Sequence, residues 1–252
     1  MKFNKLGKSD LKVSSYCLGS MTFGEATSET DSHLQIDQSI EAGINFVDTA
    51  EMYPTCPLRE ETTGDTEVII GNWIEKNKSK RSDFILATKI SGKGYNAVRN
   101  GEGIDKNSIK IAIDGSLKKL KTDYIDLYQL HWPNRGSYHF RQNWNYNPTN
   151  QNTDIAKENM NGVINSLSDL QKEGKIRYVG LSNETCWGTL QFLDQLKNFS
   201  NLTIASIQNE YSLLCRLYDL DMAEMSHHEN ISLLSYSPLA GGFLTGKYIN
   251  DN

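Results

Sequence analysis

Short apolar runs alternate along this chain with longer segments in which apolar residues recur every three or four positions. The strand-type runs occupy residues 16–21, 45–49, 84–88, 125–130, 176–181, 205–208 and 231–236. Several of them are nearly continuously apolar, which is typical of strands buried on both faces of a parallel sheet. Because single helices between such strands act as crossovers, the alternation predicts an α/β fold built on parallel strands.

The segments between these runs predict the helices. Residues 108–120 carry one apolar stripe opposite several lysines, at positions Ile109, Ala112, Ile113, Leu117 and Leu120. Further stripes are formed by Met160, Val163, Ile164, Leu167 and Leu170 before Gly174, by Ile70, Trp73 and Ile74, and by Ile36 and Ile40 before Gly43. We also expect Asn183 to be the N-cap of a helix, since asparagine suits that position.

Parallel strands with crossover helices are compatible with a (β/α)8 barrel and with a doubly wound sheet. Residues 18–24 read Leu-Gly-Ser-Met-Thr-Phe-Gly, which lacks the GxGxxG phosphate motif of a Rossmann unit. The length of 252 residues suits a barrel. We therefore expect a (β/α)8 TIM barrel as a single domain over residues 1–252. Residues 3–6 and 11–13 predict a β-hairpin that caps its amino-terminal mouth.

Composition and charge exclude several classes of function. With 26 basic and 31 acidic side chains the net charge is -5, and the absence of a dense Lys/Arg block argues against binding of nucleic acid. The sequence contains neither an apolar stretch of membrane-spanning length nor a signal region at its amino terminus, so we expect a cytoplasmic protein. The four cysteines lie far apart and lack the spacing of a metal site, so no metal is expected.

One segment interrupts the alternation, from Pro133 to about Glu158. It is rich in asparagine and contains the aromatic residues Tyr138, Phe140, Trp144 and Tyr146. A loop of this length is uncommon inside a compact domain. It is either a mobile surface insertion or a flap over a binding site, because it follows a strand end on the face where barrels build their sites.

Four polar residues lie at or just after the carboxyl ends of three successive predicted strands: Asp48, Tyr53, Lys89 and His131. Each alone has an ordinary structural interpretation, but together they fall on the face that carries barrel active sites. Lys89 can favour the phenolate of Tyr53, and Asp48 can hold the buried ammonium. His131 can orient a substrate oxygen. The set predicts proton delivery to a carbonyl oxygen, with hydride coming from a bound cofactor.

Five runs of the sequence resemble the aldo-keto reductase family, and the likeness extends in order from Leu6 to Tyr248. The runs are Gly-Ile-Asn-Phe-Val-Asp-Thr-Ala-Glu-Met-Tyr at 43–53, Ala-Thr-Lys at 87–89, Asp-Tyr-Ile-Asp-Leu-Tyr-Gln-Leu-His-Trp at 123–132, Gly-Lys-Ile-Arg-Tyr-Val-Gly-Leu-Ser-Asn at 174–183 and Tyr-Ser-Pro-Leu at 236–239. Shorter runs at 51–54, 71–73 and 182–185 look like the bacterial Tas-type branch. The resemblance implies a barrel, NADP(H) as cofactor, and reversible reduction of a small aldehyde or ketone to an alcohol.

The resemblance also implies a role for each matching residue. Tyr53 would be the general acid, Lys89 and Asp48 the pair that lowers its pKa, and His131 the group that orients the substrate. The positions that match the family's cofactor contacts are Gly19, Ser20, Met21, Asp48, Ser182, Asn183, Gln208, Tyr236, Ser237, Pro238, Leu239, Ala240, Gly241 and Lys247. Among these, Ser182, Asn183 and Gln208 would hold the nicotinamide carboxamide, Tyr236 would stack on its ring, and residues 237–241 would wrap the pyrophosphate.

The family's eighth strand, with the segment that grips the 2′-phosphate after it, has no counterpart in the sequence. We therefore expect a barrel that lacks strand 8 and its helix, and an amino-terminal fragment of a longer protein. Two alternatives to the reductase remain open, namely a cofactor-binding, redox-sensing regulatory subunit and an inactive fragment. The sequence leaves the physiological substrate, the choice between NADPH and NADH, and the oligomeric state open.

Overall fold

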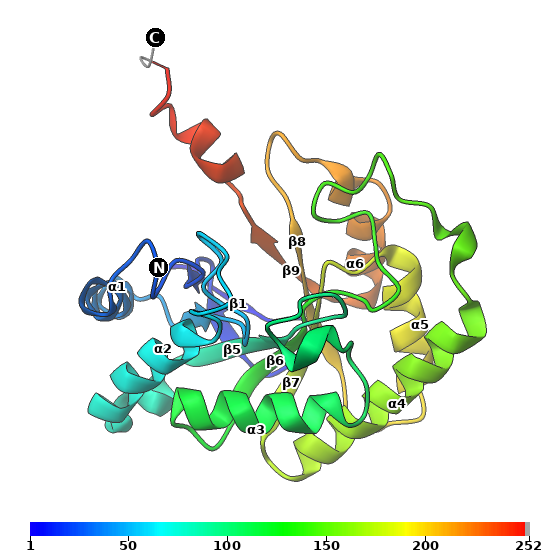
Figure 1. Cartoon of the computed structure of the whole chain (residues 1–252), viewed down its shortest axis with the longest axis horizontal. Helices are drawn as coiled ribbons and strands as arrows, with labels where there is room; N and C mark the ends of the chain where they lie inside the picture. Colours follow the sequence, from blue (N-terminus) through cyan, green and yellow to red (C-terminus); the bar gives the residue numbers. More distant parts are fainter. Residues whose placement is uncertain (250–252) are drawn as a thin grey trace.

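The computed structural model describes residues 1–249, which form a curled parallel sheet with helices on its outside (Figure 1). The hairpin strands are β1 (Phe3–Lys5) and β2 (Lys12–Ser14), and the sheet strands are β3 (Leu18–Gly19), β4 (Phe46–Asp48), β5 (Ile85–Ile90), β6 (Ile125–Leu130), β7 (Ile176–Ser182), β8 (Ile204–Glu210) and β9 (Ser232–Tyr236). The helices are α1 (Glu29–Glu41), α2 (Asp65–Lys76), α3 (Ser108–Leu120), α4 (Thr153–Lys172), α5 (Cys186–Leu196) and α6 (Met222–Glu229). Short 3₁₀ turns are η1 (Lys78–Asp83), η2 (Arg99–Gly101), η3 (Pro148–Asn150), η4 (Leu217–Asp219) and η5 (Ala240–Thr245).

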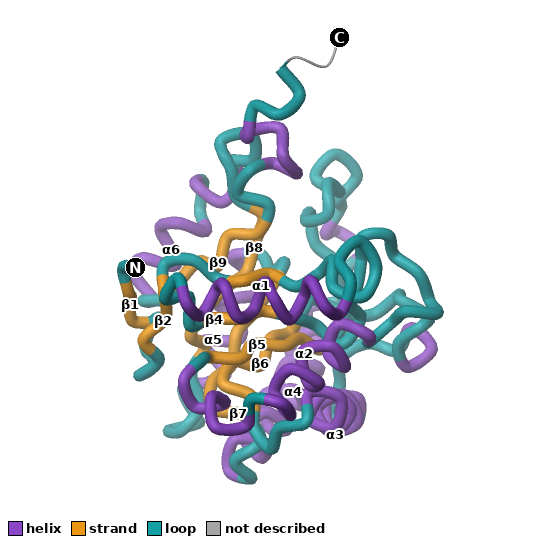
Figure 2. The backbone as a smooth tube through the Cα atoms, turned by 90° about the vertical axis from the view of Figure 1, so that its left-hand side faces the viewer, coloured by secondary structure: helices purple, strands orange, loops and turns teal. Residues whose placement is uncertain are grey.

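The seven sheet strands follow one another in chain order, from β3 to β9, and every neighbouring pair is parallel. One α-helix lies between each strand and the next, as the alternation in the sequence predicts. Figure 2 shows the strands gathered behind α1, with α2, α3 and α4 outside them. This strand and helix order is the one that the sequence predicts for a (β/α)8 barrel without its eighth strand. Within residues 1–249 the sheet contains seven strands, with β3 and β9 at its edges.

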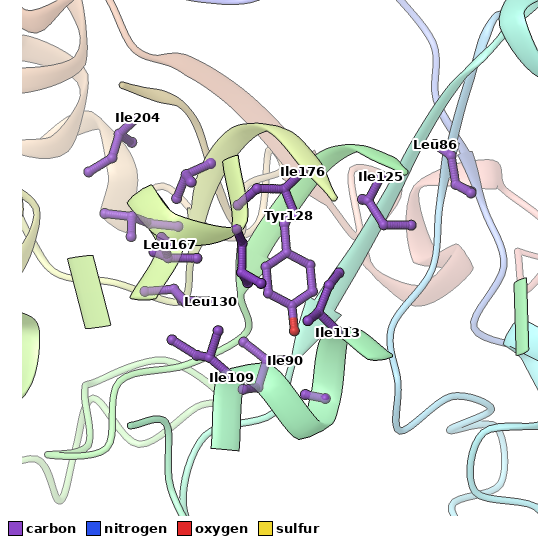
Figure 3. Close-up of a cluster of buried hydrophobic side chains, with 14 of the residues drawn as sticks. Leu86, Ile90, Ile109, Ile113, Ile125, Tyr128, Leu130, Leu167, Ile176 and Ile204 are labelled. Atoms are coloured by element: carbon purple, nitrogen blue, oxygen red, sulfur yellow. The ribbon is translucent and has the colours of Figure 1, made fainter. Parts of the chain in front are cut away.

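The larger hydrophobic core lies between the sheet and its outer helices. Ile109 and Ile113 of α3 are fully buried there, as is Leu167 of α4, and they pack with the outward-facing side chains Leu86 and Tyr128 (Figure 3). The stripe expected over residues 108–120 therefore forms the buried face of α3. The stripe expected before Gly174 does the same for α4.

A second core fills the interior of the curled sheet, and the hairpin contributes to it. Leu6, Leu11 and Val13 are buried against Phe46 and Leu127, which belong to β4 and β6. Strands β1 and β2 pair antiparallel, so the hairpin predicted from the sequence is confirmed. The apolar side chains of the hairpin region close the interior below the carboxyl ends of the strands.

Several boundaries differ from the prediction. Strand β5 continues beyond Thr88 through Ile90, and β8 continues beyond Gln208 to Glu210, because their ladders with β6 and β9 extend that far. The edge strand β3 is shorter than the expected run at 16–21. The loop after β6 is also shorter than expected, since α4 already begins at Thr153.

Asn183 is not a helix N-cap, as we expected it to be. Thr185 caps α5, and its side chain accepts a hydrogen bond from the Gly188 amide. Asn183 instead adopts a left-handed conformation with a φ of 51°. Its backbone amide bonds to the Gln208 carbonyl at 3.0 Å, which holds this corner of the chain against β8.

The segment after β9 leaves the body of the sheet. Figure 1 shows it, in red, extending away from the strands toward the carboxyl end of the described chain. It contains η5 and several left-handed residues, among them Ser237, Ala240 and Gly241. Within residues 1–249 no helix is both long enough and apolar enough to cross a membrane.

Candidate active site

Four polar side chains form a layer inside the curled sheet, directly above its apolar interior. Side chains alternate between the two faces of a strand, so Asp48, Lys89 and Gln129 share the inner face with Phe46, Ala87 and Leu127, which lie two residues earlier in β4, β5 and β6. In the ladder Lys89 lies opposite Gln129. Gln208 of β8 completes the layer by donating to the Asp48 carboxylate at 3.1 Å.

Asp48 and Lys89 form a buried ion pair at the centre of this layer. Lys89 Nζ lies 2.5 Å from Asp48 Oδ2 and 2.8 Å from the Thr49 carbonyl, and the lysine is fully buried. Burial alone lowers the pKa of Lys89, but Asp48 and Tyr53 more than offset this effect and raise it above its usual value. The lysine therefore carries a positive charge in the interior of the site.

Tyr53 follows β4 in a loop that returns over this pair. Its hydroxyl lies 3.5 Å from Lys89 Nζ, and the ammonium is 4.8 Å from the centre of the phenol ring. Burial raises the pKa of Tyr53, and Lys89 opposes this shift without reversing it. The lysine acts on the phenol in the expected direction, but the net pKa is raised rather than lowered. The hydroxyl consequently stays protonated near neutral pH.

His131 comes directly after β6 and lies against Tyr53, with ring centres 5.6 Å apart in an edge-to-face arrangement. Burial, together with the charge of Lys89, lowers the pKa of His131 well below its usual value. Its Nδ1 atom is buried and has no hydrogen-bond partner among the described residues. A neutral imidazole next to a phenol suits hydrogen bonding to an uncharged oxygen of a substrate.

Gln129 belongs to this cluster although sequence reasoning did not select it. Its Nε2 donates to Asp48 Oδ1 at 2.8 Å, so the carboxylate accepts bonds from Lys89, Gln129 and Gln208. Gly180 makes room for this side chain, because a Cβ at that position would lie 2.7 Å from Ser206 Oγ and 3.0 Å from Gln129 Cγ. The signal in the sequence that could have identified Gln129 is a polar residue within a largely apolar strand.

The residues expected to hold a carboxamide meet at the ends of β7, β8 and β9. Ser182 Oγ donates to the Gln208 carbonyl at 2.9 Å, and Asn183 Nδ2 donates to the His131 carbonyl at 2.9 Å. The Tyr236 hydroxyl donates to Asn183 Oδ1 at 2.8 Å. These amide and hydroxyl groups, with an aromatic ring beside them, are of the kind that bind a nicotinamide carboxamide, which would replace some of the bonds that they make to one another. The residues present therefore fit that group.

The other predicted cofactor positions divide into two sets. Gly19 pairs with Asp48 across the β3–β4 ladder, and Ser20 Oγ donates to the Asp48 carbonyl at 2.7 Å, so both border the catalytic layer. Met21, which follows, is partly exposed. The second set lies on the segment that extends from β9, and the structure does not bring it onto the catalytic layer (Figure 1). This set consists of Ser237, Pro238, Leu239, Ala240, Gly241 and Lys247.

Two cavities open near this end of the sheet. A cavity of about 660 Å³ lies between the loop after β6 and the loop after β8, and both Tyr138 and Ala240 line it. A larger one, of about 920 Å³, lies outside the sheet between the first turns of α3 and α4, with Trp132 on its wall. Among the residues described, no group of three or more His, Cys, Asp or Glu side chains is placed to hold a metal ion.

Fold and site together define an α/β barrel protein whose strand ends carry a tyrosine, a neutral histidine and a buried lysine–aspartate pair. A sequence comparison with protein families matches residues 16–252 to the aldo/keto reductase family, so the chain belongs to this family. Aldo/keto reductases generally use a nicotinamide cofactor. Family membership therefore makes the chain an oxidoreductase by class.

Similar proteins extend this assignment. "Protein tas" of Escherichia coli is 42% identical over 253 residues, which cover 99% of this chain and 71% of that protein. "Uncharacterized oxidoreductase YrpG" of Bacillus subtilis is 30% identical over 258 residues, covering the whole chain and 71% of that protein. "Norsolorinic acid reductase B" of Dothistroma septosporum is 28% identical and covers 92% of this chain and 55% of its own length. The likeness to the Tas-type branch inferred from the sequence is confirmed.

Proposed function

We propose that this protein is an NADP(H)-dependent reductase that converts a small aldehyde or ketone reversibly to an alcohol, with Tyr53 as the proton donor. The observation that carries the proposal is the position of the Tyr53 hydroxyl, 3.5 Å from the buried Lys89 ammonium and beside a neutral His131. A site of this kind delivers a proton to an oxygen on which negative charge develops.

Each of the four residues has one task in this reaction. The chemistry that NADPH would supply, when bound, is a hydride for the carbonyl carbon. His131 donates a hydrogen bond to the carbonyl oxygen and orients it, which a neutral imidazole can do without adding a charge. Tyr53 transfers its hydroxyl proton to the same oxygen. Lys89 stabilises the resulting phenolate, and Asp48 keeps the ammonium charged and in place.

The cofactor contacts follow the positions expected from the sequence. Ser182, Asn183 and Gln208 would hold the carboxamide, and Tyr236 would stack on the nicotinamide ring. Residues 237–241 would bind the pyrophosphate through their backbone amides, since left-handed residues in this segment expose such groups. Gly19, Ser20 and Met21 would border the ribose, and Lys247 would reach a phosphate. This function fits a cytoplasmic protein that binds a small carbonyl substrate and neither nucleic acid nor a membrane.

The Tyr53→Phe variant tests the proposal. NADPH oxidation is followed with a panel of small aldehydes, and binding of NADPH is measured by fluorescence titration. We expect the variant to lose about 10²- to 10⁴-fold in kcat, the usual contribution of a general acid, with NADPH affinity unchanged. Equal rates in the two proteins would exclude Tyr53 as the proton donor.

The same titration separates the alternatives. Tight NADPH binding without turnover of any aldehyde would favour a cofactor-binding regulatory subunit. Absence of binding would identify an inactive chain. Parallel titration with NADH tests the preference for NADP(H), which we expect to appear as tighter binding of the phosphorylated cofactor.

A further inference from the structure

A second buried ion pair, between Glu51 and Arg99, lies next to the catalytic cluster and has no place in the reaction described above. Glu51 is 6% exposed, the Arg99 side chain is 10% exposed, and Arg99 Nη1 lies 2.5 Å from Glu51 Oε2. Burial raises the pKa of Glu51, and its bonds to Arg99 and to the Ser91 amide oppose that shift. Buried ion pairs of this kind are weak evidence for stability, because desolvation consumes most of the attraction.

The contacts of this pair converge on Ser91, the first residue after β5. Glu51 Oε1 accepts a hydrogen bond from the Ser91 amide at 2.5 Å, and Arg99 Nη2 donates to the Ser91 carbonyl at 3.0 Å. One carboxylate and one guanidinium thus occupy both backbone groups of a single residue. Lys89 lies two residues before Ser91 in the chain.

The backbone of the Tyr53 loop is tied to the same strand. The Thr49 amide donates to the Ala87 carbonyl at 2.9 Å, and the Glu51 amide donates to the Lys89 carbonyl at 3.1 Å, so the ladder continues past the end of β4. The Glu51 side chain provides the next link in this series by binding Ser91. Two residues further, the Tyr53 amide bonds back to the Ala50 carbonyl at 3.1 Å.

We propose that the Glu51–Arg99 pair is a clamp that positions the Tyr53 hydroxyl against Lys89. It joins the loop that carries the phenol to the strand that carries the ammonium, directly beside both residues. Glu51 and Arg99 act through Tyr53 and Lys89 and do not touch the substrate, so they are positioning residues. The expected effects on kcat rest on the proposed reductase function, whereas the expected effect on the Tyr53 loop does not.

Glu67 provides a matched control in the same part of the fold. It is a fully buried carboxylate of α2 that accepts bonds from Thr88 Oγ1 at 2.7 Å and from Lys119 Nζ at 3.1 Å. Thr88 points to the helix side of β5, whereas Lys89 points inward. Removing the charge of Glu67 disturbs the same strand from its helix side. The bonds of the Gly64 and Thr66 amides to the Tyr53 carbonyl, which also hold the Tyr53 loop, do not involve the Glu67 side chain.

The kinetic experiment compares Glu51→Gln, Arg99→Met, the double variant and Glu67→Gln, with NADPH and 4-nitrobenzaldehyde. A displacement of about 1 Å can cost about 10²-fold in rate, so we expect kcat to fall about 10- to 100-fold in both clamp variants. NADPH affinity should stay within about twofold. The double variant should regain stability, because no unpaired charge remains, but not kcat. Recovery of kcat together with stability would show a merely structural role and overturn the proposal.

The pH profile gives a readout that a general loss of stability does not move. The reduction needs a protonated Tyr53, so kcat falls as pH rises through the pKa of this residue. A phenol that moves away from Lys89 but stays buried keeps the raising effect of burial on its pKa and loses the lowering effect of the ammonium, so this alkaline limb should shift to higher pH in Glu51→Gln and Arg99→Met. It should not shift in Glu67→Gln. Identical alkaline limbs in all variants would overturn the proposal.

Amide hydrogen exchange on the cofactor-free protein tests the clamp independently of activity. Peptides that cover residues 49–55 should exchange faster in Glu51→Gln and Arg99→Met than in the wild type, and at the wild-type rate in Glu67→Gln. If the wild-type protein showed no turnover, the proposed reductase function would be wrong, but the exchange rates would still show whether the Glu51–Arg99 pair holds the Tyr53 loop. Unchanged exchange over residues 49–55 in both clamp variants would overturn it.

Discussion

The two ends of strands β4 to β6 each hold a buried ion pair, but the two pairs are used differently. At the amino ends, Arg81 and Asp126 are almost fully buried and lie 2.9 Å apart. At the carboxyl ends, Lys89 and Asp48 lie 2.5 Å apart. Barrels place their chemistry at the carboxyl ends of the strands and use the opposite end for stability. The surroundings of the two pairs show how this division arises.

Each of the three nitrogens of the Arg81 guanidinium donates to another group of the protein. Its guanidinium donates to Thr122 Oγ1, to the carbonyls of Phe84 and Tyr124 and to Asp126, and it stacks on the Tyr124 ring at 4.0 Å. With all three nitrogens bonded inside the protein, this cluster serves to join the amino ends of the strands.

At the catalytic end, the contacts run from Asp48 through Lys89 to the Tyr53 hydroxyl. Within residues 1–249 the only hydrogen bond that the structure shows for that hydroxyl is the one it accepts from Lys89, and Nδ1 of the neighbouring His131 ring has no partner. Unused hydrogen-bonding capacity beside a buried charge distinguishes the catalytic end from the structural one.

Removing the carboxylate at the structural end should produce the largest loss of stability. In Asp126→Asn an amide nitrogen replaces either Oδ2, which accepts bonds from Arg81 and the Leu86 amide, or Oδ1, which accepts a bond from Arg177. We expect a loss of about 3–5 kcal/mol in the free energy of unfolding, because a buried charge remains unpaired. Urea unfolding measures the loss, and kcat of the folded fraction should stay unchanged. A drop in kcat comparable to that of Tyr53→Phe would contradict the division between the two ends.

Acid should destabilise the catalytic end first, because its two buried histidines are uncharged. His139 is 8% exposed, and burial lowers its pKa to about 4, against about 6.5 in an unfolded chain. Between these values the unfolded chain binds a proton that the folded chain does not, so stability falls as pH falls. From about pH 7.5 to about pH 5 the expected loss from this residue is about 2 kcal/mol. His139→Asn should remove this part of the pH dependence in urea unfolding, and equal slopes in the two proteins would refute it.

Much of the fold follows from periodicity along the chain. Helix α3 covers the residues expected for it, and the order of strands and crossovers agrees with the alternation of apolar patterns. Asp48, Tyr53, Lys89 and His131 could be selected because each lies close to the carboxyl end of a predicted strand, where a barrel directs polar side chains into one mouth.

Other features depend on contacts between distant strands and could not be predicted. Gln129 reaches Asp48 only because the β5–β6 register places it opposite Lys89. Asn183 precedes a helix and has the chemistry of an N-cap, but its backbone is turned by a bond to Gln208 of another strand. The net pKa of Tyr53 depends on the balance between burial and charge, and the sequence shows the lysine but not the extent of burial.

The smallest effect should come from the exposed member of the structural cluster. Arg177 Nη1 donates to Asp126 Oδ1 at 2.8 Å, but half of the Arg177 side chain is exposed, whereas that of Arg81 is 9% exposed. Water can replace most of the interactions that Asp126 loses in Arg177→Ala. We therefore expect the free energy of unfolding, measured in urea, to fall by less than about 1 kcal/mol, with no change in kcat. Concentrated salt should shrink the difference further, because exposed charges are screened. A loss as large as that of Asp126→Asn would mean that the cluster depends on both arginines. Its stability would then come from a network of three charges rather than from burial of the Arg81–Asp126 pair.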